Sequence, residues 1–278
     1  MGTKRWDDGA LTLSFETTGD QGDPLVLVHG GWDDASGWDL VVPGLATALQ
    51  VLAYDRRGHG GSTGRPRGRP LRDDTADLAR LLESTQLFPA HLVGQGYGGA
   101  VALRLAVDRP ELVRSVIAHE LPFVGLLSAA SSGSLSGASV PQRLGEVRAL
   151  VGTGSPELAA RRYLALFAAP GEQWGELDGP TRGVLLRNAR PWAEEMADPE
   201  ALHPPVAELR EVDVPVLLTA GGRSPAFSSE IHALLAEELP NATAVALREA
   251  GHFVHRTDPD LFAGVVGTFL LERNVPST

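Results

Sequence analysis

The sequence contains no cysteine. This absence excludes disulfides, a thiolate nucleophile, and zinc or iron–sulfur sites held by cysteine. Long hydrophobic runs are absent too, because no stretch approaches the ~18 apolar residues that a membrane span requires. The segment 1–8 carries Lys4, Arg5 and two aspartates with no apolar run behind them, so it is not typical of a secretory signal. We therefore expect a protein of the cytoplasm.

Positive charge is scarce, since 24 Lys and Arg residues face 35 Asp and Glu residues and the net charge is −11. Such a surface repels the phosphates of nucleic acids and anionic lipids, so neither is an expected partner. The one basic stretch, 65–72, is rich in Gly and Pro and is typical of a solvated loop. We expect a small-molecule substrate, no cofactor and no metal, in a monomer or homodimer.

Short apolar runs alternate with amphipathic stretches along most of the 278 residues. This alternation predicts an α/β fold, in which a mostly parallel sheet is covered by helices on both faces. Functional residues of such sheets collect at the carboxyl ends of the strands. The expected strands are 11–15, 25–28, 51–54, 91–93, 113–118, 214–219 and 243–247, and the expected helices are 38–49, 73–87, 100–107, 228–238 and 259–271.

The alternation stops between Glu120 and Asp213, where two helical stretches, 156–169 and 181–196, follow a segment (128–139) rich in Ser, Gly and Ala. We expect that segment to be a mobile connection. The domain prediction is a core of residues 1–121 and 206–278, with residues 122–205 inserted as a helical lid over the strand ends. Aromatic residues of the lid could line an apolar pocket or form the lid's own core: Phe123, Phe167, Trp174 and Trp192.

The most informative segment is Gly94-Gln95-Gly96-Tyr97-Gly98-Gly99, which joins an expected strand to an expected helix. The nucleophile elbow, G-x-S-x-G, has this form, and its serine projects from the tight turn. Gly96 stands at the serine position. The same glycines also match the dinucleotide-binding pattern G-x-G-x-x-G, with Glu120 in place of the ribose-binding acid. That alternative leaves the His-Gly-Gly turn at 29–31 unexplained.

Several segments together resemble the α/β-hydrolase superfamily over nearly the whole chain. They are His29-Gly30-Gly31-Trp32, the segment 55–60 (Asp-Arg-Arg-Gly-His-Gly), the elbow, and Gly251-His252-Phe253. The turn Glu120-Leu121-Pro122 is similar to a Glu-Pro-Pro-like turn of small-molecule hydrolases of actinobacterial type. The resemblance implies the α/β-hydrolase fold, a mostly parallel sheet of about eight strands with a helical lid.

The resemblance also implies roles for individual residues. His252 matches the catalytic base. The usual acid position is Ser224, which offers no carboxylate, so we assign the acid to Glu120, with Asp33, Asp34 or no acid as alternatives. The oxyanion donors would be the N–H groups of Gly31 or Trp32 and of Tyr97. The expected substrate-binding residues are Trp32, Phe123, Phe167, Trp192 and Phe253, whereas His59, His119 and His255 are expected to be structural or exposed.

A glycine at position 96 has no atom that can attack a substrate, and loss of such a nucleophile costs a serine hydrolase about 10⁶ in turnover. One hypothesis is non-covalent acid–base chemistry on a bulky apolar molecule, such as an ester, a lactone or a polyketide-like metabolite of secondary metabolism. The alternatives are a serine esterase whose nucleophile was replaced, and a binding protein on an inactive hydrolase scaffold. The missing serine side chain predicts a roomy cavity above Gly96.

Overall fold

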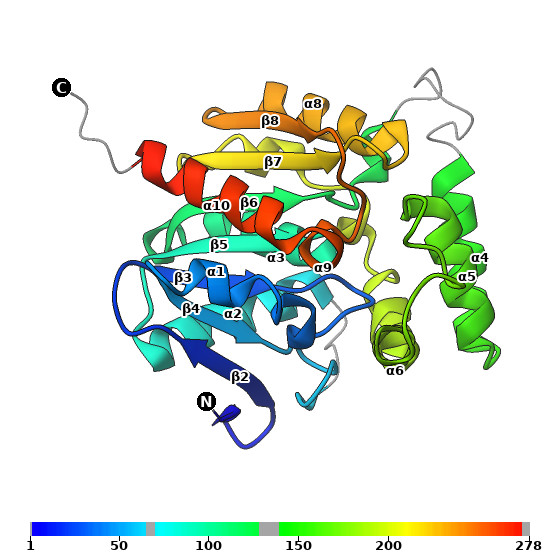
Figure 1. Ribbon diagram of the computed structural model, residues 1–278, viewed down its shortest axis with the longest axis horizontal. Helices are drawn as coiled ribbons and strands as arrows, with labels where there is room; N and C mark the ends of the chain where they lie inside the picture. Colours follow the sequence, from blue (N-terminus) through cyan, green and yellow to red (C-terminus); the bar gives the residue numbers. More distant parts are fainter. Residues whose placement is uncertain (1, 65–69, 128–138, 274–278) are drawn as a thin grey trace.

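The computed structural model describes residues 2–64, 70–127 and 139–273. Within them an eight-stranded sheet has the order β1-β2-β4-β3-β5-β6-β7-β8 (Figure 1). The strand β2 is antiparallel to β1 and β4, and all other neighbours are parallel. This confirms the predicted mostly parallel sheet. The strands are β1 Lys4–Asp7, β2 Thr12–Thr18, β3 Pro24–Val28, β4 Gln50–Tyr54, β5 Ala90–Gln95, β6 Val113–His119, β7 Val216–Gly221 and β8 Ala242–Leu247.

Side chains alternate between the two faces of the sheet, as the period of a β-strand requires. On β3, Val26 and Val28 join the apolar cluster that includes α2, α3 and α8, while Leu25 and Leu27 join the cluster that includes α1, α9 and α10. Both faces of the sheet are therefore buried beneath helices. The helices are α1 Val42–Leu45, α2 Pro70–Thr85, α3 Tyr97–Asp108, α4 Ser139–Gly152, α5 Pro156–Phe167, α6 Gly179–Glu195, α7 Val206–Leu209, α8 Ala226–Glu238, α9 Val254–Thr257 and α10 Pro259–Arg273.

Three helices, α4, α5 and α6, lie together beyond the carboxyl ends of the parallel strands (Figure 1). They contact one another and belong to the segment 122–205. That this segment is a separate lid stays a prediction, and the expected mobile connection, 128–138, lies outside the described residues. None of the helices in the described ranges is both long enough and apolar enough to cross a membrane.

The predicted helix 38–49 is wrong. The chain forms a 3₁₀ turn, Ala35–Trp38, and then only the four residues of α1. Pro43 in the first turn of α1 has no N–H to donate to the preceding turn, so the helical pieces stay separate. The helix α4 and the short strand β1 were not predicted. In α4, Pro141 and Gly145 weaken the helical signal of the sequence.

Candidate active site

The turn between β5 and α3 is built from glycines that the packing demands. A Cβ atom on Gly98 would lie 2.1 Å from the carbonyl oxygen of Val28, and one on Gly94 would lie 2.4 Å from a backbone nitrogen of α3. Gly96 has φ 54° and ψ −120°, a left-handed backbone that favours glycine. A Cβ on Gly96 would meet only Glu120 O, at 3.9 Å. The space at Gly96 is therefore open to a small side chain.

Two buried side chains from neighbouring strand ends meet beside this turn. The Nδ1 atom of His252, in the loop after β8, lies 2.7 Å from Oε2 of Glu120, which follows β6 directly. The other oxygen of Glu120 accepts a hydrogen bond from the N–H of Gly221 at 2.8 Å. Burial raises the pKa of the Glu120 carboxyl, but the hydrogen bond from His252 together with the neighbouring His119 and Ser224 outweighs burial and lowers the pKa to about 2. The carboxylate can only accept, so Nδ1 of His252 carries the proton.

The predicted contact between Glu120 and His252 is thus confirmed as geometry. The two alternative acids, Asp33 and Asp34, form ion pairs with other side chains. Asp33 accepts hydrogen bonds from Arg256 and contacts His255 at 3.3 Å, and Asp34 accepts from Arg187 at 2.9 Å. The catalytic role of Glu120 itself stays a prediction.

The other ring nitrogen of His252 is reached by two side chains that the sequence did not point to. Gln95 Nε2 lies 3.0 Å from Nε2 of His252, and the hydroxyl of Tyr163 on α5 lies 3.3 Å from it. Because Nδ1 holds the proton, Nε2 is the acceptor and both side chains donate to it. Gln95 occupies a variable position of the elbow pattern, and Tyr163 is one residue of an amphipathic helix, so neither carried a signal.

A third unpredicted residue, Glu172, fixes the loop that carries His252. Its carboxylate accepts hydrogen bonds from the backbone N–H groups of Ala169, at 2.8 Å, His252, at 3.1 Å, and Phe253, at 3.0 Å. Three N–H donors on one buried carboxylate tie the segment between α5 and α6 to the histidine loop. The position of His252 therefore depends on both parts of the chain.

The predicted oxyanion donors lie on two sides of Gly96. Tyr97 is the first residue of α3, so its N–H has no acceptor within the helix. Gly31 and Tyr97 line the same cavity as Gly96 and His252. Trp32 lies outside that wall and packs against Trp192 at a ring separation of 4.8 Å. The oxyanion role of these backbone groups stays a prediction.

Known proteins are similar to this chain in sequence and in fold. A model of the alpha/beta hydrolase family matches residues 25–265. The chain belongs to this family. It is 30% identical to rhodomycin D methylesterase from Streptomyces peucetius, covering 91% of this chain and 92% of that protein. It is 27% identical to the magnesium-chelatase 30 kDa subunit of Rhodobacter capsulatus, covering 88% and 86%.

Solved structures support the same fold. The enol-lactonase from Burkholderia xenovorans LB400 superposes with a TM-score of 0.78 at 21% identity, over 96% of this chain and all of that one. Some similar proteins are longer. The chain spans 38% of the dihydrolipoyllysine-residue acetyltransferase component of the acetoin cleaving system from Cupriavidus necator, at 34% identity. The predicted superfamily is therefore confirmed, and the dinucleotide-binding alternative loses its basis.

The cavity of this α/β-hydrolase is small. Its volume above Gly96 is about 20 Å³, and a site of ~10–15 Å³ already holds one water molecule. The prediction of a roomy pocket is wrong for this structure, because aromatic side chains, that of Tyr163 among them, form a close wall around the space. The ring of Tyr163 packs 4.9 Å from Phe167 and 5.2 Å from Trp32. Of the predicted substrate-binding residues, Phe167 and Trp192 line the cavity.

Three predicted aromatic residues lie away from the cavity wall. Phe123 is buried in the main apolar cluster. Phe253 packs its ring edge-on against His252, 4.9 Å away, because its backbone begins α9 and is held by Glu172. Trp174 packs beneath the guanidinium groups of two arginines on α5 and α6. Their place in substrate binding is therefore not supported.

The remaining histidines singled out by the sequence are buried and bonded to the protein. His119 Nε2 contacts Gly251 O and His59 Nε2 contacts Gly31 O, both at 3.1 Å, while His255 contacts Asp33. Burial lowers the pKa of all three, to about 4 for His119 and about 3 for His59. They are structural and not exposed.

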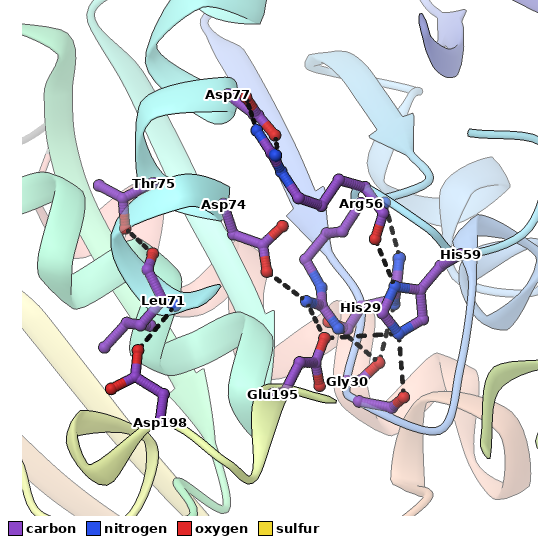
Figure 2. A network of polar contacts seen from close by, with 12 residues as sticks. His29, Gly30, Arg56, His59, Leu71, Asp74, Thr75, Asp77, Glu195 and Asp198 are labelled. Carbon is purple, nitrogen blue, oxygen red and sulfur yellow. Dashed lines mark hydrogen bonds and ion pairs between the residues drawn. The ribbon is translucent and has the colours of Figure 1, made fainter. Parts of the chain in front are cut away.

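A buried ion-pair network joins the end of α6 to the core (Figure 2). Arg56, which follows β4, donates to Asp74 on α2 at 2.9 Å and to Glu195, the last residue of α6. One cation thus serves two buried carboxylates. Burial outweighs the opposing charge of Arg56 and raises the pKa of Asp74 to about 6 and that of Glu195 to about 8. The contact between helix and core is therefore expected to depend on pH.

Glu195→Gln should remove that dependence. The pKa of Glu195 is raised in the folded state from an unfolded value of about 4.3. The folded protein then binds this proton more tightly, so its stabilising contribution is present at low pH and is lost as the pH rises toward 8. Between pH 6 and pH 8 the wild type should lose about 2 kcal/mol of unfolding free energy relative to Glu195→Gln. Urea denaturation of both proteins at several pH values measures this. A difference that is constant with pH would contradict it.

Proposed function

We propose that this α/β-hydrolase is an enzyme that acts on an apolar small molecule, an ester, a lactone or a polyketide-like compound, by acid–base chemistry without a covalent nucleophile. The observation that carries the proposal is the Glu120–His252 pair beside a glycine. The pair supplies a base, because Nε2 of His252 carries a lone pair that becomes available when Gln95 and Tyr163 give up their contacts to it. Gly96 supplies no group to attack the substrate.

The chemistry assigns each part a task. His252 takes a proton at Nε2, and the carboxylate of Glu120 stabilises the imidazolium that forms. The backbone N–H groups of Gly31 and Tyr97 would hold the negative charge that develops on the substrate oxygen. Neither donor depends on the side chain at position 96, so substitution of serine by glycine leaves both in place.

The names of the relatives support the substrate class. One similar protein is a methylesterase and one solved neighbour is an enol-lactonase, and both names denote cleavage of an acyl–oxygen bond. Since the cavity has room for little more than a water molecule, a substrate must displace the ring of Tyr163 from it. We propose that α4, α5 and α6 form the lid that makes this displacement possible.

The test is turnover of a panel of p-nitrophenyl esters and aliphatic lactones by the wild type and by His252→Ala. We expect the variant to lower kcat by about 10²–10⁴, the usual contribution of a general base. Glu120→Gln should lower kcat as well, because an amide cannot stabilise the imidazolium.

A substitution at a buried histidine without such a role serves as the control. His255→Asn, at the Asp33 contact, should change kcat little provided that the variant folds, which circular dichroism establishes. If no ester or lactone is turned over, the proposed function is wrong and a binding protein is favoured. If turnover is equal in wild type and His252→Ala, the proposed acid–base mechanism is wrong.

A further inference from the structure

The small cavity over Gly96 has the properties of a site for a reacting water molecule. We propose that the attacking nucleophile of this enzyme is a water bound in the space that a side chain at position 96 would fill, with Gln95 as its positioning residue. The proposal rests on the proposed function and narrows it to hydrolysis.

The first observation is space. The nearest atom to a Cβ built on Gly96 is Glu120 O at 3.9 Å, whereas Cβ atoms on Gly94 and Gly98 would lie within 2.5 Å of backbone atoms. The glycine at 96 thus leaves room that the packing of the turn does not need. The cavity of about 20 Å³ is lined by this residue, by His252 and by Gln95. A bound water needs ~10–15 Å³ and two to four polar partners, so the volume fits one.

The second observation is the set of polar partners. Nε2 of His252 accepts, because Nδ1 donates to Glu120. The amide nitrogen of Gln95 lies 3.0 Å from that Nε2, on a side chain that is almost fully buried. That direct contact leaves no room for a water between the two nitrogens, so the water would lie beside them. It would accept from the amide and replace the amide as the donor to the imidazole lone pair. These two contacts orient one lone pair of the water toward a substrate carbonyl above Gly96.

The remaining contact to Nε2 comes from the group that the substrate displaces. The Tyr163 hydroxyl lies 3.3 Å from it, on a ring that forms part of the cavity wall. A substrate that enters the cavity would displace Tyr163 from this contact, and the Gln95 amide would remain beside His252 as a donor to the water.

The proposed reaction balances. The water oxygen forms a bond to the carbonyl carbon while its proton passes to Nε2 of His252, and the carbonyl electrons move to the oxygen held by Gly31 and Tyr97. When the tetrahedral species collapses, the bond to the leaving oxygen breaks. That oxygen takes the proton from Nε2. The products are a carboxylic acid and an alcohol, and the enzyme returns to its starting state.

Gly96→Ala is the decisive variant, because a methyl group fits the space and fills the water position. We expect it to lower kcat for the most active p-nitrophenyl ester by about 10²-fold or more. Gly9→Ala is the matched control. Gly9 has φ 84° with nothing within 4 Å of a Cβ, so this variant carries the same kind of backbone strain far from the cavity.

Gln95→Ala should lower kcat about tenfold with KM little changed, which corresponds to one lost hydrogen bond to the reacting water. A merely structural role of Gln95 would instead lower the unfolding free energy without this separation of kcat from KM. Equal kcat in the wild type and Gly96→Ala, with kcat still lost in His252→Ala, would overturn the water proposal and leave the proposed acid–base function standing.

A measurement without turnover completes the test. High-resolution crystal structures of the wild type and of Gly96→Ala should show an ordered water within hydrogen-bond distance of His252 Nε2 in the former only. A wild-type crystal in which that position holds no water contradicts the proposal, whether or not any ester is cleaved.

Discussion

Gly96→Ser should make the protein react covalently with a small fluorophosphonate, at a rate about 10³-fold or more above that of the wild type. The reason is that every other part of a serine nucleophile site is in place. The cavity receives a side chain from position 96 without a clash. Nε2 of His252, which also lines the cavity, can take the hydroxyl proton once the serine replaces Gln95 and Tyr163 as its donor. The backbone donors would hold the phosphonyl oxygen. Intact-protein mass spectrometry over time gives the rate.

The double variant Gly96→Ser with His252→Ala is the control for this gain. It keeps the hydroxyl and removes the base, so its labelling should fall back to about the wild-type rate. A folded Gly96→Ser protein that stays unlabelled would show that position 96 is not the elbow position. In that case the alignment of this turn with the nucleophile elbow would have to be abandoned.

Arg56→Met should destabilise the fold by about 3–5 kcal/mol, which is a large part of the stability of an ordinary domain. The guanidinium of Arg56 has no exposed surface, and it is the cation that faces both Asp74 and Glu195. Removing it leaves the buried Asp74 carboxylate without this counter-charge, which is the costly way to break a buried ion pair. It also leaves Glu195, whose pKa of about 8 keeps it largely protonated at neutral pH, without the hydrogen bond from Arg56. Urea denaturation at neutral pH measures the loss.

An exposed arginine provides the comparison. Arg190 pairs with Glu194 on the surface of α6, where two thirds of the arginine side chain is exposed. Arg190→Met should change the unfolding free energy by no more than about 0.5 kcal/mol. Equal changes in unfolding free energy at the two positions would mean that the Arg56 network does not stabilise the packing of α6 against the core.

The contact between Glu120 and His252 could be predicted because it follows from topology. Glu120 comes directly after one strand of a parallel sheet and His252 lies in the loop after another, and the carboxyl ends of such strands meet at one edge. The need for glycine in the elbow could also be predicted from the sequence, since Gly94 and Gly98 stand where a tight turn brings backbone atoms close together. Local patterns and one topological rule were enough for this part of the site.

The contacts of Gln95, Tyr163 and Glu172 could not be predicted, because each depends on how distant segments pack. Tyr163 reaches His252 across 89 positions of sequence, and Glu172 reaches the same loop across 80. The amphipathic pattern of α5 predicts which face of the helix is buried, but it does not predict which side chains of other segments that face contacts. The size of the cavity was misjudged for the same reason, since the missing serine was considered without the aromatic side chains that line the cavity, such as Tyr163, Phe167 and Trp192.

The most direct test of the central claim is intact-protein mass spectrometry of the wild type, quenched with acid in the first turnovers at a saturating p-nitrophenyl ester. General-base chemistry by His252 without a nucleophile predicts that product forms while the mass of the protein stays that of the unmodified chain. An added mass equal to the acyl group, on His252, Tyr163 or any other residue, would contradict the account.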